Sequence, residues 1–111
     1  MNIRHLHHWD IKYREAVDIQ QKLKGQLILH DTGSPGDIKT VAGADISYSK
    51  QDGMFFAAVV LLAYPTMDII EEVSLSEKAA FPYIPGLLSF REGPALLRAF
   101  ERLKSVPDCV I

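Results

Sequence analysis

The sequence predicts an α/β fold in which a meander of three antiparallel strands leads to a helix and then to a parallel strand. Three observations support this class: strand-like segments separated by short links, a helical segment after them, and a final apolar segment. With 111 residues, 48% of them hydrophobic, the chain suits one globular domain rather than a disordered segment. We interpret residues 1–111 as a single, incomplete domain, with an N-terminal helix and loop over 1–39 and a ββ-βαβ core over 40–111.

The first helix is predicted to begin at Asp10, whose carboxylate can cap it, and to end near Gly25. A loop is predicted from His30 to Gly36, where Asp, Ser, Gly and Pro cluster. One face of the helix has apolar and neutral side chains at helical spacing: Tyr13, Ala16, Val17, Gln20 and Leu23.

Three strands are predicted along the middle of the chain. The core of the second strand, residues 55–62, is continuously apolar, which is typical of a strand buried on both faces. In the third strand, Ile69, Val73 and Leu75 carry much of the apolar side. The three strands are predicted over Thr40–Ser49, Met54–Tyr64 and Asp68–Ser76.

Short links at Asp52-Gly53 and Pro65-Thr66 favour antiparallel pairing of neighbouring strands. A Pro-rich loop from Phe81 to Gly86 then leads to a helix predicted over about Gly93 to Lys104. A last strand is expected to begin within Pro107–Ile111. This order of elements is the one with which a ribonuclease-H-like α/β fold opens, and its fourth strand lies parallel to the first.

Charge and composition narrow the function classes. A formal charge of -2 and a pI of about 6.0 argue mildly against nucleic-acid binding, although the site of a metal-dependent nuclease is acidic by design. The one cysteine, Cys109, excludes a disulfide framework and fits a reducing, cytoplasmic location. No signal peptide is expected, since residues 1–10 are polar and His-rich, and the longest apolar run, 55–64, is too short to span a bilayer.

Asp45 is the first candidate for chemistry. It follows Ala42, Gly43 and Ala44 in an apolar strand, where a buried carboxylate is costly unless it is paired or bound to a cation. The small neighbours leave room for a ligand to approach the backbone. An exposed aspartate at the end of a strand, or one bonded to a nearby loop, is an equally good interpretation.

Glu92 is the second candidate, because it heads a largely apolar helix face. Ser89 and Glu92 match a capping box, which would give Glu92 a purely structural role. Alternatively, Pro94 occupies the first helical position with Gly93 as the cap, and Glu92 then lies just before the helix, facing the sheet. Two carboxylates on adjacent elements suit Mg²⁺, which prefers oxygen ligands.

The loop Pro82-Tyr83-Ile84-Pro85 has two prolines that stiffen its tip. A rigid tip with an aromatic and an aliphatic side chain could wedge into a base stack. A packed turn, with or without a cis proline, is the simpler interpretation.

Two groups of basic or metal-binding residues are assigned no chemistry. The N-terminal histidines are predicted to lie in a mobile, solvated end, and the basic residues of the first helix on a solvated face. These residues are His5, His7 and His8, and Lys12, Arg14, Lys22 and Lys24.

Three stretches resemble the endonuclease V family: Val41–Tyr48, Ala57–Leu62 with Tyr64-Pro65, and Phe81–Leu97. The last stretch is long, ungapped and unusual, and the resemblance extends from about Trp9 to Ile111. It implies a ribonuclease-H-like fold and a repair nuclease that hydrolyses a phosphodiester bond on the 3′ side of deoxyinosine in DNA, or of inosine in RNA. Mg²⁺ is the implied cofactor, with Mn²⁺ as a substitute.

The resemblance also implies roles for single residues. Asp45 and Glu92 would be catalytic metal ligands, and Arg91 would contact nucleic acid. The wedge that separates strands at the lesion would consist of Pro82, Tyr83, Ile84 and Pro85, with Tyr83 at its tip.

The chain departs from the family pattern after the strand begun by Asp108. In the family this strand runs into an Asp-Gly motif that supplies a further metal ligand, and a later histidine also serves the site. The expectation is therefore a truncated chain, inactive alone: a gene fragment, an incomplete sequence, or half of a split nuclease completed by a separate C-terminal half or by self-association. The alternative function is a non-catalytic nucleic-acid-binding or interaction module.

Overall fold

The computed structural model describes residues 1–31 and 33–111, so Thr32 of the predicted loop lies outside the described residues. The α/β class and the three-strand meander are confirmed. In chain order the elements are α1 (Tyr13–Lys24), the short 3₁₀ helix η1 (Pro35–Asp37), β1 (Thr40–Ser49), β2 (Met54–Ala63), β3 (Ile69–Lys78), α2 (Leu88–Glu101) and β4 (Cys109–Val110).

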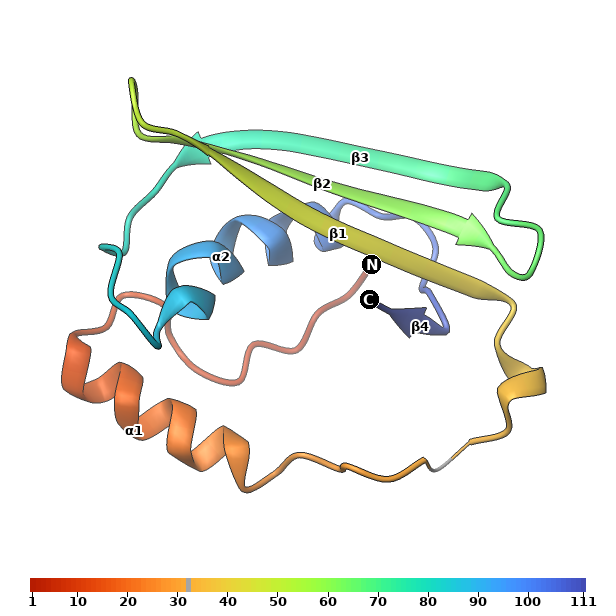
Figure 1. Ribbon diagram of the computed structural model, residues 1–111, viewed down its shortest axis with the longest axis horizontal. Coiled ribbons are helices and arrows are strands. Elements are labelled where there is room, and N and C mark those ends of the chain that lie inside the picture. Colours follow the sequence, from red (N-terminus) through yellow and green to blue (C-terminus); the bar gives the residue numbers. More distant parts are fainter. Residues whose placement is uncertain (32) are drawn as a thin grey trace.

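The four strands form one sheet in the order β3-β2-β1-β4 (Figure 1). β2 pairs antiparallel with both β1 and β3, as the short links predict. β4 pairs parallel with β1, with Val41 beside Cys109. The predicted parallel fourth strand is therefore confirmed.

One face of the sheet packs against α2. The core comes from alternate residues of β2, because successive side chains of a strand point to opposite faces. The other face of β2 is open among the described residues: Phe56 is 48% exposed, so the prediction that β2 is buried on both faces is wrong. The buried residues of this core are Ala42, Phe55, Ala57, Val59, Leu61, Ala95, Ala99, Phe100 and Leu103.

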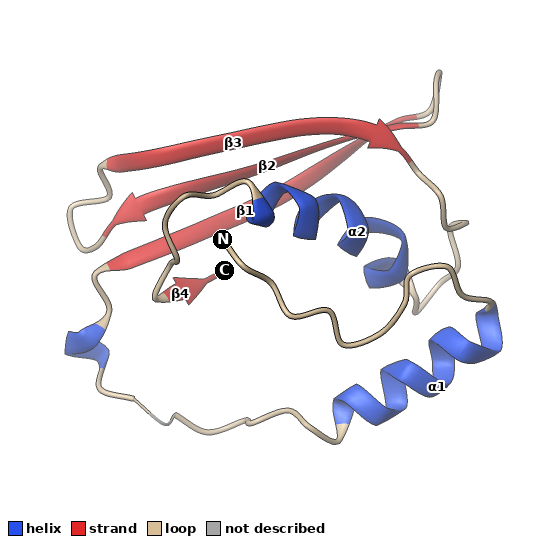
Figure 2. Ribbon diagram, turned by 180° about the vertical axis from the view of Figure 1, so that it is seen from behind, coloured by secondary structure: helices blue, strands red, loops and turns tan. Residues whose placement is uncertain are grey.

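A second, smaller cluster joins α1 to the first half of α2. It buries Ala16, Phe81, Leu87 and Phe90. Figures 1 and 2 show α1 set apart from the sheet, on the side of β4. The turn that leads into α2 is thus packed against α1, while the rest of α2 packs against the strands.

The starts of α1 and β3 differ from the predictions, as does that of α2, which lies at Leu88 rather than Gly93. α1 begins at Tyr13, and Lys12 is its N-cap with no side-chain bond, so Asp10 does not cap the helix. β3 begins at Ile69, which is 61% exposed rather than on the apolar side. An irregularity in the β2 ladder between Leu61 and Leu62 shifts the register there.

The prediction of a mobile, solvated N-terminus is wrong. Residues 1–11, here named the N-terminal strap, pack against α2: the Met1 amine donates to the Glu101 carbonyl at 2.9 Å, and Ile3 packs against the core. His5 Nε2 lies 2.9 Å from Glu101 Oε1. Apolar Met1, Ile3 and Trp9 between the polar residues are the signal that the His-rich composition concealed.

The basic residues of α1 lie on an exposed face, as predicted: Lys12, Arg14, Lys22 and Lys24. Within residues 1–31 and 33–111, no helix has the length and apolar character needed to cross a membrane.

Candidate metal and nucleic-acid site

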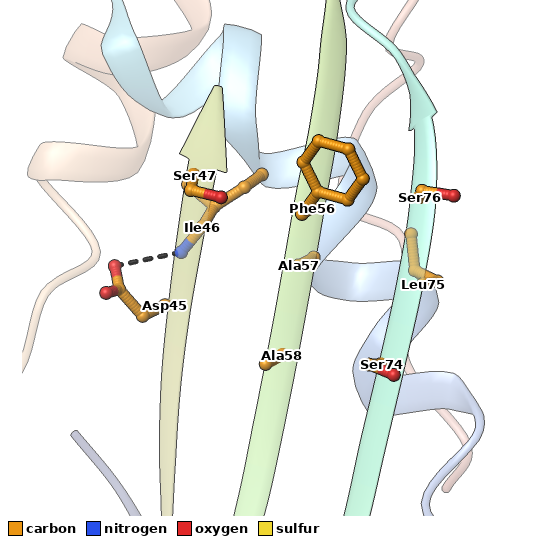
Figure 3. Close-up of a pocket in the computed structure, with 9 residues that line it drawn as sticks. All are labelled: Asp45, Ile46, Ser47, Phe56, Ala57, Ala58, Ser74, Leu75 and Ser76. Atoms are coloured by element: carbon orange, nitrogen blue, oxygen red, sulfur yellow. Dashed lines mark hydrogen bonds between the residues drawn. The ribbon is translucent and has the colours of Figure 1, made fainter. Parts of the chain in front are cut away.

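Asp45 lies in the second half of β1 with its side chain exposed, opposite Ala58 of β2. Its Oδ1 accepts the backbone N–H of Ile46 at 2.8 Å. Figure 3 shows the carboxylate turned to the side of β1 that faces away from β2. The carboxylate therefore stands at an open edge and keeps acceptor capacity for a ligand.

The parallel strand β4 reaches β1 just before Asp45. Ile111 N–H donates to the Ala42 carbonyl at 2.9 Å, and Ala44 N–H donates to the Ile111 carbonyl at 3.2 Å. β4 pairs with β1 in the register of Val41 with Cys109. A strand that continued in this register would run beside Asp45. The site thus lies where two parallel strands run together.

The start of β4 is held by a reciprocal bond between Asp108 and Thr40. Asp108 Oδ2 accepts from the Thr40 hydroxyl at 2.9 Å and from the N–H groups of Lys39 and Thr40 at 3.0 and 2.9 Å. In return the Thr40 hydroxyl accepts the Asp108 N–H at 3.0 Å. The Lys39 N–H, followed by the Thr40 hydroxyl and N–H, holds the pKa of Asp108 below its usual value.

Glu92 lies half-buried inside α2, and not ahead of it. The helix begins at Leu88 with Leu87 as N-cap and no side-chain cap bond, so neither the Ser89 capping box nor the Gly93 cap forms. Burial of Leu87 and Phe90 against α1 favours this early start, although Pro94 then interrupts the helical hydrogen bonds.

The two carboxylates come from different layers. Ala44 and Ile46, on either side of Asp45, pack against the α2–sheet core, so Asp45 alternates away from that core while Glu92 belongs to α2. Among the described residues, no three His, Cys, Asp or Glu side chains gather closely enough to hold a metal ion. Asp45 and Glu92 carry carboxylates, the hard oxygen donors that Mg²⁺ prefers, so both side chains fit this ion by their chemistry.

A shallow hollow of about 550 Å³ lies next to Asp45 on the open face of the sheet (Figure 3). Phe56 stands in it, with small hydroxyl side chains on the strands to either side. These polar side chains are Ser47 on β1 and Ser74 and Ser76 on β3.

The proline loop, residues 82–85, exposes one side chain and packs another against the rest of the chain. Tyr83 is 68% exposed, whereas Ile84 packs against the cluster between α1 and α2. The loop is tied down by the Gln20 side chain, which donates to the Gly86 carbonyl at 2.8 Å. The cis peptide bond considered for this loop is found elsewhere, between Tyr64 and Pro65.

Arg91, predicted to contact nucleic acid, is already engaged within the chain. Its Nη1 donates to the Phe81 carbonyl at 2.7 Å. Its guanidinium lies over the rings of Tyr48 and Phe55, at 4.8 and 5.3 Å from their centres. Arg91 therefore joins the proline loop to α2 and β1, a role that sequence reasoning missed.

Comparisons with known proteins show the family of this chain. The family model described as Endonuclease V matches residues 21–111. The endonuclease V of Dehalococcoides mccartyi is 47% identical over 112 residues, which cover 100% of this chain and 49% of the relative. That of Gloeobacter violaceus is 38% identical, over 96% of this chain and 43% of the relative.

Solved structures agree as well. The crystal structure of endonuclease V from Bacillus subtilis matches with a TM-score of 0.89 at 31% identity, over 99% of this chain and 48% of that one. Endonuclease V of Ciona intestinalis, in complex with a 24mer DNA containing an inosine followed by a ribo-adenosine, matches with a TM-score of 0.75 at 30% identity, over 83% and 39% of the two chains. The chain spans about half the length of the curated relatives it matches. It belongs to the endonuclease V family.

Proposed function

We propose that this chain carries part of the active site of an inosine-directed endonuclease, which hydrolyses the phosphodiester bond one nucleotide beyond inosine or deoxyinosine on its 3′ side. The observation that carries the proposal is the exposed Asp45 carboxylate at the edge where β1 and β4 run in parallel. Family membership and the inosine-containing DNA bound by the Ciona relative support it.

Asp45 and Glu92 would hold a divalent cation, Mg²⁺ or Mn²⁺, through carboxylate oxygens. When bound, such a cation favours the attack of water on the phosphate and stabilises the charge that develops there. Hydrolysis adds water across the bond between phosphorus and the 3′ oxygen and leaves a 3′-hydroxyl and a 5′-phosphate. The remaining ligands would come from outside residues 1–111.

The proline loop would separate the strands at the inosine. Tyr83 is the side chain free to stack on a base, because Ile84 is packed and Pro82 and Pro85 stiffen the tip. Arg91 and Gln20 would keep this tip in place through their bonds to Phe81 and Gly86.

The alternative function is a nucleic-acid-binding module that hydrolyses nothing. Two observations favour it. No group of three metal-binding side chains forms among the described residues, and base stacking by the exposed Tyr83 needs no cation. Strand cleavage distinguishes the two functions: only the nuclease cuts the nucleic acid, and the cut requires Asp45.

The test is cleavage of an end-labelled oligonucleotide that contains one deoxyinosine, with Mg²⁺ or Mn²⁺ and with a chelator as control. With the C-terminal half of a full-length relative added to supply the remaining ligands, the proposal expects a single cut on the 3′ side of inosine, none with guanine in its place, and none from the Asp45→Asn or Glu92→Gln chain. Binding of the oligonucleotide without any cut would favour the module, and a cut that survives Asp45→Asn would overturn the assignment of the site.

A further inference from the structure

Trp9 of the N-terminal strap touches α2 at the residue directly after Glu92. A Cβ atom placed on Gly93 would lie 2.9 Å from Cη2 of the Trp9 ring, closer than real Cβ atoms approach, and 3.2 Å from Cζ3. The ring also meets His7 edge-on at 4.4 Å and Phe90 at 6.1 Å between centres. The Trp9 ring therefore fills the space beside Gly93, and any side chain at position 93 would clash with it.

The helix lacks one of its own hydrogen bonds at this point. Pro94 has no N–H, so the Phe90 carbonyl lacks its helical donor. The N-cap residue Leu87 provides no side-chain bond. The turn over residues 88–93 consequently depends on packing more than the rest of α2 does.

The strap is anchored at its other end as well. The Met1 amine and His5 contact Glu101, in the last turn of α2, while Trp9 contacts Gly93 near its start. Figure 2 shows the strap running along α2 between these points. The strap precedes residues 21–111, which the family model matches.

We propose that Trp9 is a positioning residue: it fixes the turn of α2 that carries Arg91 and Glu92, and so sets where the Glu92 carboxylate stands. The effect on Glu92 rests on the proposed function of that residue as a metal ligand. The fixing of the turn itself does not depend on it.

The first experiment is a pair of substitutions at the contact. Alanine forms helix better than glycine, so Gly93→Ala would raise the melting temperature if nothing stood beside it. We expect Gly93→Ala to lower the melting temperature of the native chain and to raise it in a Trp9→Ala chain, with Ser89→Ala as the control on the same turn. A rise in both backgrounds would overturn the proposal. Trp9→Leu, which keeps an apolar side chain, serves if Trp9→Ala does not fold.

The second experiment separates positioning from general stability. Hydrogen exchange of the amides at 90–93 should accelerate in Trp9→Ala, while exchange at 97–101 stays unchanged; equal acceleration in both would mean a merely structural role and overturn the proposal.

The half-saturating Mn²⁺ concentration should rise several-fold in the folded Trp9→Ala variant, and an unchanged value would contradict the effect on Glu92. If the native chain itself bound no Mn²⁺, the proposed function would fail, and the exchange data would still decide whether Trp9 fixes the turn.

Discussion

Arg91 and Phe81 are joined by a 2.7 Å bond from the guanidinium of α2 to the carbonyl that precedes the proline loop. This bond fixes the position of the start of the loop relative to α2. The same guanidinium covers the rings of Tyr48 and Phe55, so one side chain connects the loop, the helix and two strands.

Replacement of Arg91 by lysine should therefore loosen the loop, because an ammonium cannot reach Phe81 and cover two rings at once. A lost bond of a charged group costs about 1.5–3 kcal/mol, which corresponds to a fall in melting temperature of roughly 6 °C or more in a domain of this size. Thermal unfolding of Arg91→Lys beside Arg102→Lys, an exposed arginine at the end of the same helix, checks this. Equal melting temperatures for the two variants would show that the contacts of Arg91 carry no weight.

Tyr83 and Ile84 should respond in opposite ways to replacement by alanine. Tyr83 is exposed, so Tyr83→Ala should change stability by no more than about 0.5 kcal/mol, yet weaken oligonucleotide binding about tenfold through loss of base stacking. Ile84→Ala should lower the melting temperature, because this side chain packs in the cluster between α1 and α2. Titration with a fluorescent inosine oligonucleotide measures the binding, and unchanged affinity in Tyr83→Ala would argue against a wedge.

Asp108 should make stability depend on pH. Its pKa is lowered in the folded chain, so its bonds stabilise the fold above the unfolded pKa of about 3.9 and are lost as the pH falls through that value to the lower folded pKa. Asp108→Asn should melt below the wild-type chain at pH 7, and the gap between them should shrink from pH 5 towards pH 3. Thr40→Val, which removes only the hydroxyl, should show a smaller gap. A gap that stays constant over this range would mean that the Asp108 charge does not hold β4.

The sheet was predictable because its signals are local. Asp52-Gly53 forms the expected turn, with Gly53 at a φ of 70°, and the apolar run of β2 supplies the core. The open face of β2 was missed, since a continuous apolar run reads the same whether one face or both are covered. The start of α2 was missed for a related reason: Pro94 favours a later start by local rules, while burial of Leu87 and Phe90 against α1 favours the earlier one.

The candidate site was predictable as a set of residue types but not as an arrangement. Asp45 and Tyr83 are exposed, so both side chains are accessible to a ligand, and the roles expected for them stay predictions. The contact of Trp9 with Gly93 joins residues far apart in sequence, and the bond of Arg91 to Phe81 spans the proline loop; neither leaves a periodic pattern, so only the folded chain reveals them.

The central claim is that Asp45 and Glu92 bind a divalent cation together, and the most direct measurement is Mn²⁺ binding followed by electron paramagnetic resonance. Titration of the chain, of Asp45→Asn, of Glu92→Gln and of the double variant gives the bound Mn²⁺ at each concentration. Our account predicts weaker binding in each single variant, and a loss of binding free energy in the double variant that differs from the sum of the two single losses, because both carboxylates serve one ion. Binding that is the same in all four chains would contradict it.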